Sequence, residues 1–330
     1  MARKPINKHH PEVIMSYRVG IDLGGTNIVA GVVNDDYEIV AKASCKTNVP
    51  RPEAEICDSM AAVVKEAIKK AKLKMDDIDY IGIGVPGAVN PETRIIETSP
   101  NLFFKNWEIA KMMEERLHKY TKVENDANAA ALGEFLAGSA KGTKNAIAIT
   151  LGTGVGGGII IDGKIYSGSN YAGAELGHMV IVKDGRECGC GRKGCWEAYA
   201  SATALINMTK EAIRNEKAEF SYMLHLADDD IDNVNGKTAF DAQQAGDNTG
   251  AEVIDKYINY LATGLINIIN IFQPDVLCIG GGIAGQGENL LGPLRTIIER
   301  ERFTKYNEKQ TQVCIATLGN DAGIIGAACL

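Results

Sequence analysis

The chain has 330 residues, a formal net charge of −7 at pH 7 and a hydrophobic content of 45%. This length exceeds the size at which one hydrophobic core usually stops growing, so we expect two domains. The acidic balance argues against a nucleic-acid partner, because such proteins normally present a basic face. The N-terminus lacks the apolar segment of a secretory signal, and no apolar run is long enough to predict a membrane span. We therefore expect a cytoplasmic protein that binds neither nucleic acid nor membranes.

The first predicted elements are a strand, a glycine turn and a second strand, over residues 17–34. Apolar spacing and strand-like runs then predict a helix, a strand and two further helices, at residues 54–74, 79–85, about 107–119 and 127–137. The strand–turn–strand pattern returns at residues 146–163, and superposing the two turns sets DLGG at 22–25 against TLGT at 150–153. This repeat predicts two related halves that face each other across a cleft.

The C-terminal part predicts helices at about 200–215, 250–272 and 288–302, with a strand at 275–279 and a glycine turn at 280–282 between the last two. The segment 216–249 is polar and contains three consecutive aspartates. We interpret it as a solvated surface excursion with no assigned role.

The pattern G-x-G-x-x-G occurs three times, beginning at Gly82, Gly152 and Gly280. It indicates a dinucleotide site only where it follows a strand and opens a helix, and only the third copy has that context. A nicotinamide-dependent oxidoreductase would rest on this copy alone and would leave the cysteines unexplained. A near Walker A motif at 158–164 is followed by Ile165, which has no hydroxyl to ligate magnesium, so we reject it.

Two glycine-rich β-turns are a different way to bind phosphate, because glycine lets backbone amides approach phosphate oxygens. Asp22 precedes the first turn and is suited to hold Mg²⁺ directly or through water. A pair of tight hairpins would need the same glycines, but the repetition and Asp22 favour phosphate. The residues we predict to bind ATP and Mg²⁺ at these turns are Asp22, Gly24, Gly25, Thr26, Asn27, Gly152, Thr153 and Gly154.

Three of the eight cysteines lie between residues 188 and 195, with a histidine just upstream. Without a secretion signal this crowding favours a metal site over disulfides. One histidine and three cysteines form a four-coordinate set that closes a structural Zn²⁺ site and leaves no position for a catalytic water. The alternative is a group of unbridged thiols. The predicted ligands are His178, Cys188, Cys190 and Cys195.

Four motifs together resemble the ROK family of repressors, open reading frames and kinases: DLGGTN at 22–27, ENDANAAALGE at 124–134, LGTGVGGG at 151–158 and CGCGRKGCWE at 188–197. The resemblance is strongest to the bacterial ATP-dependent glucokinases of this family, and it runs from about Arg18 to the C-terminus. It implies an α/β, actin-like and ribonuclease H-like ATPase fold with duplicated mixed sheets around an interdomain cleft. The domains would be 1–128 plus 319–330, which form the small domain, and 129–318, which form the large domain.

The resemblance also implies a reaction, the Mg-ATP-dependent phosphorylation of the 6-hydroxyl of glucose. From the residues alone, Asp126 or Asn125 is best interpreted as a helix N-cap, but Asp126 matches the family's catalytic base. Glu175, His178 and Glu197 match its sugar-contacting residues, and the zinc ligands also match. Gly87, Asn101 and Asn125 fit the remaining sugar contacts, and Gly281 and Gly282 would lie against the adenosine.

Alternatives within the family are kinases for N-acetylmannosamine, fructose or allose, which would share the same chemistry. The segment NLFFKNW at 101–107 is longer than the NL-x-x-W of many such glucokinases, which bears on the choice of sugar. A sugar-responsive repressor would need an N-terminal helix-turn-helix unit, and only about 16 residues precede the first strand. By resemblance we expect a homodimer or homotetramer.

Overall fold

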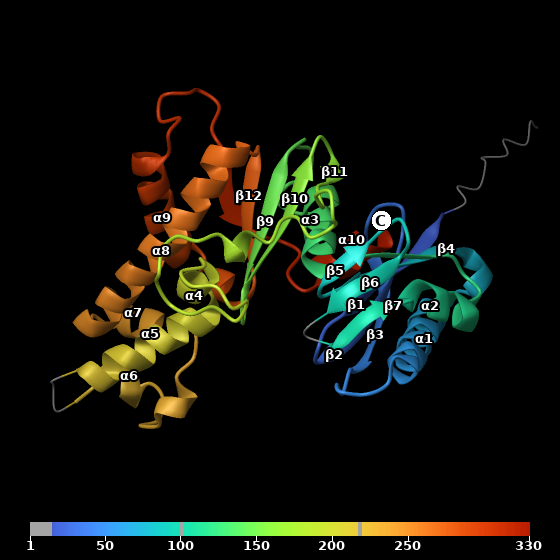
Figure 1. Cartoon of the computed structure of the whole chain (residues 1–330), viewed down its shortest axis with the longest axis horizontal. Coiled ribbons are helices and arrows are strands. Elements are labelled where there is room, and N and C mark those ends of the chain that lie inside the picture. The colour runs from blue at the N-terminus through green and yellow to red at the C-terminus, as the bar shows by residue number, and fades with distance from the viewer. Residues whose placement is uncertain (1–14, 100–101, 217–219) are drawn as a thin grey trace, which may run out of the picture.

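The computed structural model describes residues 15–99, 102–216 and 220–330, which form two lobes (Figure 1). The smaller lobe contains a five-stranded sheet in the order β3-β2-β1-β4-β8. Strands β1 to β3 are antiparallel, whereas β4 and β8 run parallel to β1. The strands are β1 (Tyr17–Leu23), β2 (Asn27–Val33), β3 (Ile39–Lys46), β4 (Ile78–Val85) and β8 (Thr121–Asn125).

The larger lobe repeats this topology with the strand order β11-β10-β9-β12-β13. Its first three strands are again antiparallel, and the last two are again parallel to the strand that starts the hairpin. The strands are β9 (Ala146–Leu151), β10 (Val155–Ile161), β11 (Lys164–Ile165), β12 (Val276–Gly280) and β13 (Gln312–Ile315). The predicted duplication is therefore confirmed.

Helices cover the outer faces of both sheets. On the small lobe these are α1 (Glu53–Lys70) and α2 (Ile109–Leu117), and on the large lobe they include α8 (Asn248–Phe272) and α9 (Glu288–Glu301). The other helices of the large lobe are α4 (Glu197–Ala200), α5 (Ala202–Asn215), α6 (Tyr222–His225) and α7 (Thr238–Gln244). A small three-stranded sheet comprises β5 (Ala88–Asn90), β6 (Ile95–Ser99) and β7 (Phe104–Trp107). The 3₁₀ turns of the described residues are η1 (Met75–Asp77), η2 (Leu176–His178), η3 (Ile231–Asn233) and η4 (Gly282–Gln286).

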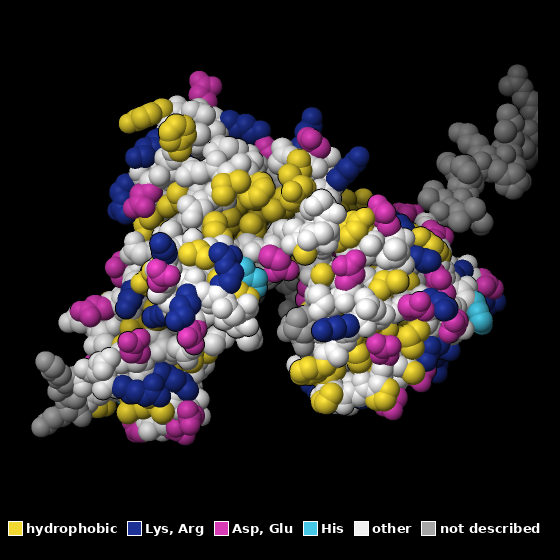
Figure 2. Space-filling model, in the orientation of Figure 1, with side chains coloured by type: hydrophobic (Ala, Val, Ile, Leu, Met, Phe, Trp, Pro, Cys, Tyr) yellow, Lys and Arg dark blue, Asp and Glu magenta, His cyan; other side chains and the backbone are white. Residues whose placement is uncertain are grey.

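Two helices, α3 (Asp126–Leu136) and α10 (Asp321–Ala328), lie between the sheets and pack against each other. Helix α3 follows β8 of the small sheet and packs on β9 and β10, while α10 follows β13 of the large sheet and packs on β1 and β4. The chain therefore crosses twice between the lobes, and Figure 2 shows a deep notch between them. The domain boundaries given above remain a prediction.

Our interpretation of residues 216–249 as a solvated excursion is wrong for much of this segment. It contains α6, η3 and α7, and Met223, Phe240 and Ala242 are buried in the core of the large lobe. The segment is polar on average, but α7 packs against α8, and α6 packs against α7 and α5. Composition over the whole segment concealed these helices.

Successive side chains of β1 and β4 point to opposite faces of the sheet, and this decides which of them face the crossing helices. In β1, Val19, Ile21 and Leu23 point into the core beneath α1, which leaves Gly20 and Asp22 on the opposite face. A Cβ on Gly20 would overlap the carbonyl oxygen of Ile324 in α10. Glycine thus lets α10 approach the sheet backbone and places Asp22 at the edge of the cleft.

We expect Gly326→Ala to destabilise the fold by about 1–3 kcal/mol, the usual cost of overpacking a close contact. Gly326 lies in α10, and a Cβ there would overlap the carbonyl oxygen of Ala129 in α3. Gly292→Ala is the matched control, because Gly292 lies inside α9 with nothing within 4 Å of an added Cβ. That change should instead stabilise by about 0.5–1 kcal/mol through helix propensity. Urea unfolding of both variants checks the pair, and equal effects would contradict close α3–α10 packing.

Candidate active site

The first predicted phosphate turn, residues 24–26, joins β1 to β2. It is held from behind by the buried Thr47, whose hydroxyl donates to Gly24 O at 2.6 Å and whose N–H donates to Thr26 O at 2.9 Å. In the described part of the chain the amides of Gly25 and Thr26 have no protein acceptor. Free amides in a turn are the donors that a phosphate requires.

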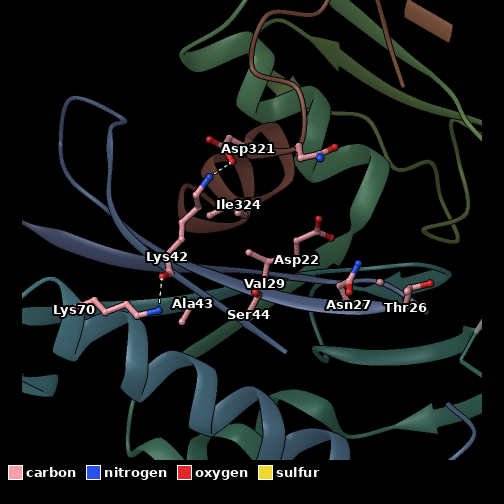
Figure 3. Close-up of a pocket in the computed structure, with 13 residues that line it drawn as sticks. Asp22, Thr26, Asn27, Val29, Lys42, Ala43, Ser44, Lys70, Asp321 and Ile324 are labelled. Atoms are coloured by element: carbon pink, nitrogen blue, oxygen red, sulfur yellow. Dashed lines mark hydrogen bonds and ion pairs between the residues drawn. The ribbon is translucent and has the colours of Figure 1, made fainter. Parts of the chain in front are cut away.

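This turn lines a cavity of about 590 Å³ between the sheet and α10. Figure 3 shows Asp22, Thr26 and Asn27 on one side of the cavity. On the other side Lys42 Nζ lies 2.7 Å from Asp321 Oδ1 of α10. Asp22 is therefore the acidic group beside the free amides of the turn, where a magnesium–phosphate complex would need it.

The second predicted turn, residues 152–154, joins β9 to β10 and is also held from behind. Gly152 O accepts from Ala202 N at 2.9 Å, and Thr153 O accepts from the Thr203 hydroxyl at 2.8 Å. Within the described residues the amides of Thr153 and Gly154 have no protein acceptor. Thr153 of this turn lines a second cavity of about 310 Å³, which shares no lining residue with the cavity at the first turn.

Asp126 is the first residue of α3, and it is not the residue that caps the helix. The side chain of Asn125 accepts from the amides of Ala127 at 2.9 Å and Asn128 at 3.1 Å, and its Nδ2 donates to Gly87 O at 3.0 Å. Burial raises the pKa of Asp126, and a hydrogen bond from the Ala127 N–H partly opposes this shift. Asn125 thus satisfies the helix terminus while the Asp126 carboxyl stays available for chemistry.

Three other carboxylates interact with Asp126 or support its surroundings. Burial and the charge of Asp126 raise the pKa of Asp22 to about 6. Burial also raises the pKa of Glu175, His178 lowers it, and the charges of Asp126 and Glu197 raise it further. Glu124 was not singled out from the sequence; it is buried and accepts from Asn125 N at 2.9 Å and Asn128 Nδ2 at 3.0 Å. Residues from both lobes therefore place their carboxylates close enough to interact.

Stability of the nucleotide-free and metal-free protein should fall as pH rises from about 4 to 6, by up to about 3 kcal/mol, because of Asp22. Its pKa is raised in the fold to about 6, so the folded protein binds more protons than the unfolded chain in this window. Asp22→Asn should remove this part of the slope and be more stable than wild type at pH 7. The exposed Asp36→Asn is the control, and urea unfolding in EDTA across this range provides the measurement. Parallel pH profiles for Asp22→Asn and wild type would refute the assignment.

The four predicted metal ligands come together. Their ligating atoms all lie within 4.8 Å of one another, with Cys188 Sγ to His178 Nδ1 and Cys190 Sγ to Cys195 Sγ both 3.7 Å. Two sulfurs bound tetrahedrally to zinc at about 2.3 Å lie roughly 3.8 Å apart, so this donor set fits Zn²⁺. The loop can wrap the site because Gly191 and Gly194 have φ of 85° and 80°, where a side chain would be strained.

The remaining predicted residues lie at several places around the cleft. Gly87 has φ of 124°, and a Cβ there would overlap the carbonyl oxygen of Thr98. Glu175 Oε2 lies 4.0 Å from His178 Nε2. Gly281, with φ of 85°, packs against the backbone of Leu151, and Gly282 begins η4. Asn101 lies outside the described residues.

Two supporting residues were not singled out from the sequence. Thr47 holds the first predicted phosphate turn and Thr203 holds the second. Thr47 lies 23 residues from the carbonyl that its hydroxyl contacts, and Thr203 lies 50 residues from its carbonyl. Only the position of Thr203 after Ser201, the N-cap of α5, offered a local hint. None of the helices in the described part of the chain has the length and apolar content needed to cross a bilayer.

Duplicated mixed sheets on either side of a cleft, joined by the crossing helices α3 and α10, define an α/β protein of the actin-like ATPase fold. The chain belongs to the ROK family, whose model matches residues 18–330. It is 35% identical to a glucokinase of Streptomyces coelicolor, over 95% of this chain and 97% of the relative. The crystal structure of a ROK family glucokinase from Streptomyces griseus, in complex with glucose and AMPPNP, has a TM-score of 0.80, 34% identity and coverage of 95% and 98%. A xylose repressor of Caldicellulosiruptor bescii is 28% identical, over 93% of this chain and 76% of the relative.

Proposed function

We propose that the chain is an ATP-dependent hexose kinase that transfers the γ-phosphoryl group of ATP to the 6-hydroxyl of glucose. The observation that carries this is the Asp126 carboxyl, which is spared from capping α3 by Asn125 and interacts with Asp22 of the small lobe and Glu175 of the large lobe; burial raises its pKa. A general base works best when its pKa is near the operating pH. The glucokinase relatives support the wider class of hexose kinase.

Asp126 would accept the proton of the 6-hydroxyl as its oxygen attacks the γ-phosphorus. The new O–P bond forms while the bond from the γ-phosphorus to the bridging oxygen breaks, and ADP leaves. The free amides of the two turns would hold the phosphates, with Thr26, Asn27 and Thr153 beside them. When bound near Asp22, Mg²⁺ would offset negative charge on the phosphate oxygens.

One ATP would have to reach both turns, with its adenosine against Gly281 and Gly282. The two turns line separate cavities here, so we infer that the lobes close about the crossing helices during the reaction. Closure would also exclude water, which otherwise competes with the sugar for the phosphoryl group.

The sugar would lie between Asp126 and the metal loop, residues 188–195, which carries the three clustered cysteines. The residues that would bind its hydroxyls or complete the site are Gly87, Asn101, Asn125, Glu175, His178 and Glu197. Carboxylates accept hydrogen bonds from hydroxyls in defined directions and discriminate against analogues that leave them unpaired. Zn²⁺ on His178 and the three cysteines would stiffen the loop that bears Glu197 and the turn that bears Glu175. We further propose a homodimer or homotetramer.

The second candidate function is phosphorylation of a different sugar by the same mechanism, because the segment at 101–107 departs from the common glucokinase pattern. ADP release measured with glucose, N-acetylmannosamine, fructose and allose separates these possibilities. We expect the highest kcat/KM with glucose. Preference for another sugar would change the substrate and leave the mechanism, whereas sugar-dependent DNA binding without ADP release with any sugar would favour a repressor.

A further inference from the structure

The carboxylate of Glu197 contacts the second phosphate turn as well as the metal loop. Glu197 begins α4, and its Oε2 accepts a hydrogen bond from Val155 N at 2.9 Å. Val155 is the first residue of β10, immediately after the turn. The other oxygen, Oε1, lies 3.6 Å from Cys188 Sγ. One side chain thus joins two segments that are more than 30 residues apart in the chain.

The same carboxylate also restricts what the turn can contain. A Cβ on Gly154 would overlap Glu197 Oε2, so the turn passes directly over the carboxylate. Ala202 and Thr203 hold the carbonyls of Gly152 and Thr153, and Glu197 holds the amide at which the chain leaves the turn. Fixing both ends keeps the intervening amides of Thr153 and Gly154 directed away from protein acceptors.

We propose that Glu197 is a positioning residue for nucleotide binding, in addition to its proposed contact with the sugar. By holding Val155 it preorganises the turn for phosphate, so nucleotide affinity depends on Glu197 even when no sugar is bound. Losing a hydrogen bond to a charged acceptor should weaken ADP binding about tenfold or more. The inference rests on the proposed kinase function.

The test is the affinity of the sugar-free protein for Mg-ADP, measured by calorimetry on wild type and three variants. Glu197→Ala should bind ADP about tenfold more weakly or worse. Glu197→Gln should recover most of the affinity, since an amide oxygen can still accept from Val155 N. The matched control is Glu252→Ala, which removes an exposed carboxylate on α8 that belongs to neither the proposed sugar site nor the proposed nucleotide site, and it should leave ADP affinity unchanged.

Zinc content per chain, measured on each variant, shows whether the metal loop is intact. Wild-type ADP affinity in Glu197→Ala, or an equal loss in Glu252→Ala, would overturn the inference. Should Glu197→Ala not fold, Glu197→Asp tests the same contact, because its shorter carboxylate no longer reaches Val155; we expect a similar loss there, and undiminished ADP affinity would also overturn the inference. Failure of wild type to bind any nucleotide would instead refute the proposed function.

Discussion

Asp126→Asn should lower kcat by about 10²–10⁴-fold, the usual contribution of a general base. Asparagine has the size of aspartate, and its carbonyl oxygen can still accept from the Ala127 N–H, as Asp126 Oδ1 does at 2.9 Å. It cannot accept the proton of the attacking hydroxyl. Glucose binding should persist, because the other sugar-binding side chains remain. ADP release gives kcat, and calorimetry gives the affinity for glucose.

Glu288→Gln is the control for this experiment. Glu288 also begins a long helix, but its carboxylate is exposed and pairs with Arg295 at 3.0 Å. Loss of this ion pair should leave the protein folded, since an exposed ion pair contributes at most about 1 kcal/mol to stability. Turnover should therefore be unchanged. Near-normal kcat in Asp126→Asn would remove Asp126 from the role of base.

Cys190→Ser should lower bound zinc from about one ion per chain to a small fraction, because a hydroxyl is a poor substitute for a thiolate ligand. Cys190 is exposed, so the change does not disturb the core directly. The loop between Glu175 and Glu197 should become less ordered, with a lower melting temperature and a raised KM for glucose. Metal analysis, thermal unfolding and kinetics give the three readouts.

Cys45→Ser provides the comparison, since Cys45 lies in β3 of the small lobe, away from the metal cluster. Its zinc content and KM should match wild type. A Cys190→Ser protein that keeps both full zinc and full activity would contradict a structural zinc at this site. The same loss of order should follow removal of zinc from wild type by a chelator.

Features encoded over short stretches of sequence were predictable. The two hairpins are marked by apolar strands on either side of glycine turns, and both form as expected, with Asp22 and Thr150 at equivalent places. The predicted metal ligands fall within 18 residues, and their side chains do come together. The motifs also identified the family, because each carries several residues in a fixed spacing.

Assignments that depend on side-chain competition were harder. The sequence offered Asn125 and Asp126 as equivalent caps for α3, and only the structure shows Asn125 in that position. Averaged polarity likewise concealed the helices within 216–249, because a few buried residues such as Phe240 suffice to attach them to the core.

The sequence by itself determined the duplicated hairpins, the cluster of predicted metal ligands and the family, because each depends on neighbours in the chain. Only the tertiary structure decided that α10 packs over Gly20, that Thr47 and Thr203 hold the two predicted phosphate turns, and that Glu197 reaches Val155. These contacts join residues far apart in sequence. They arise when whole sheets and helices pack, and no local spacing encodes them.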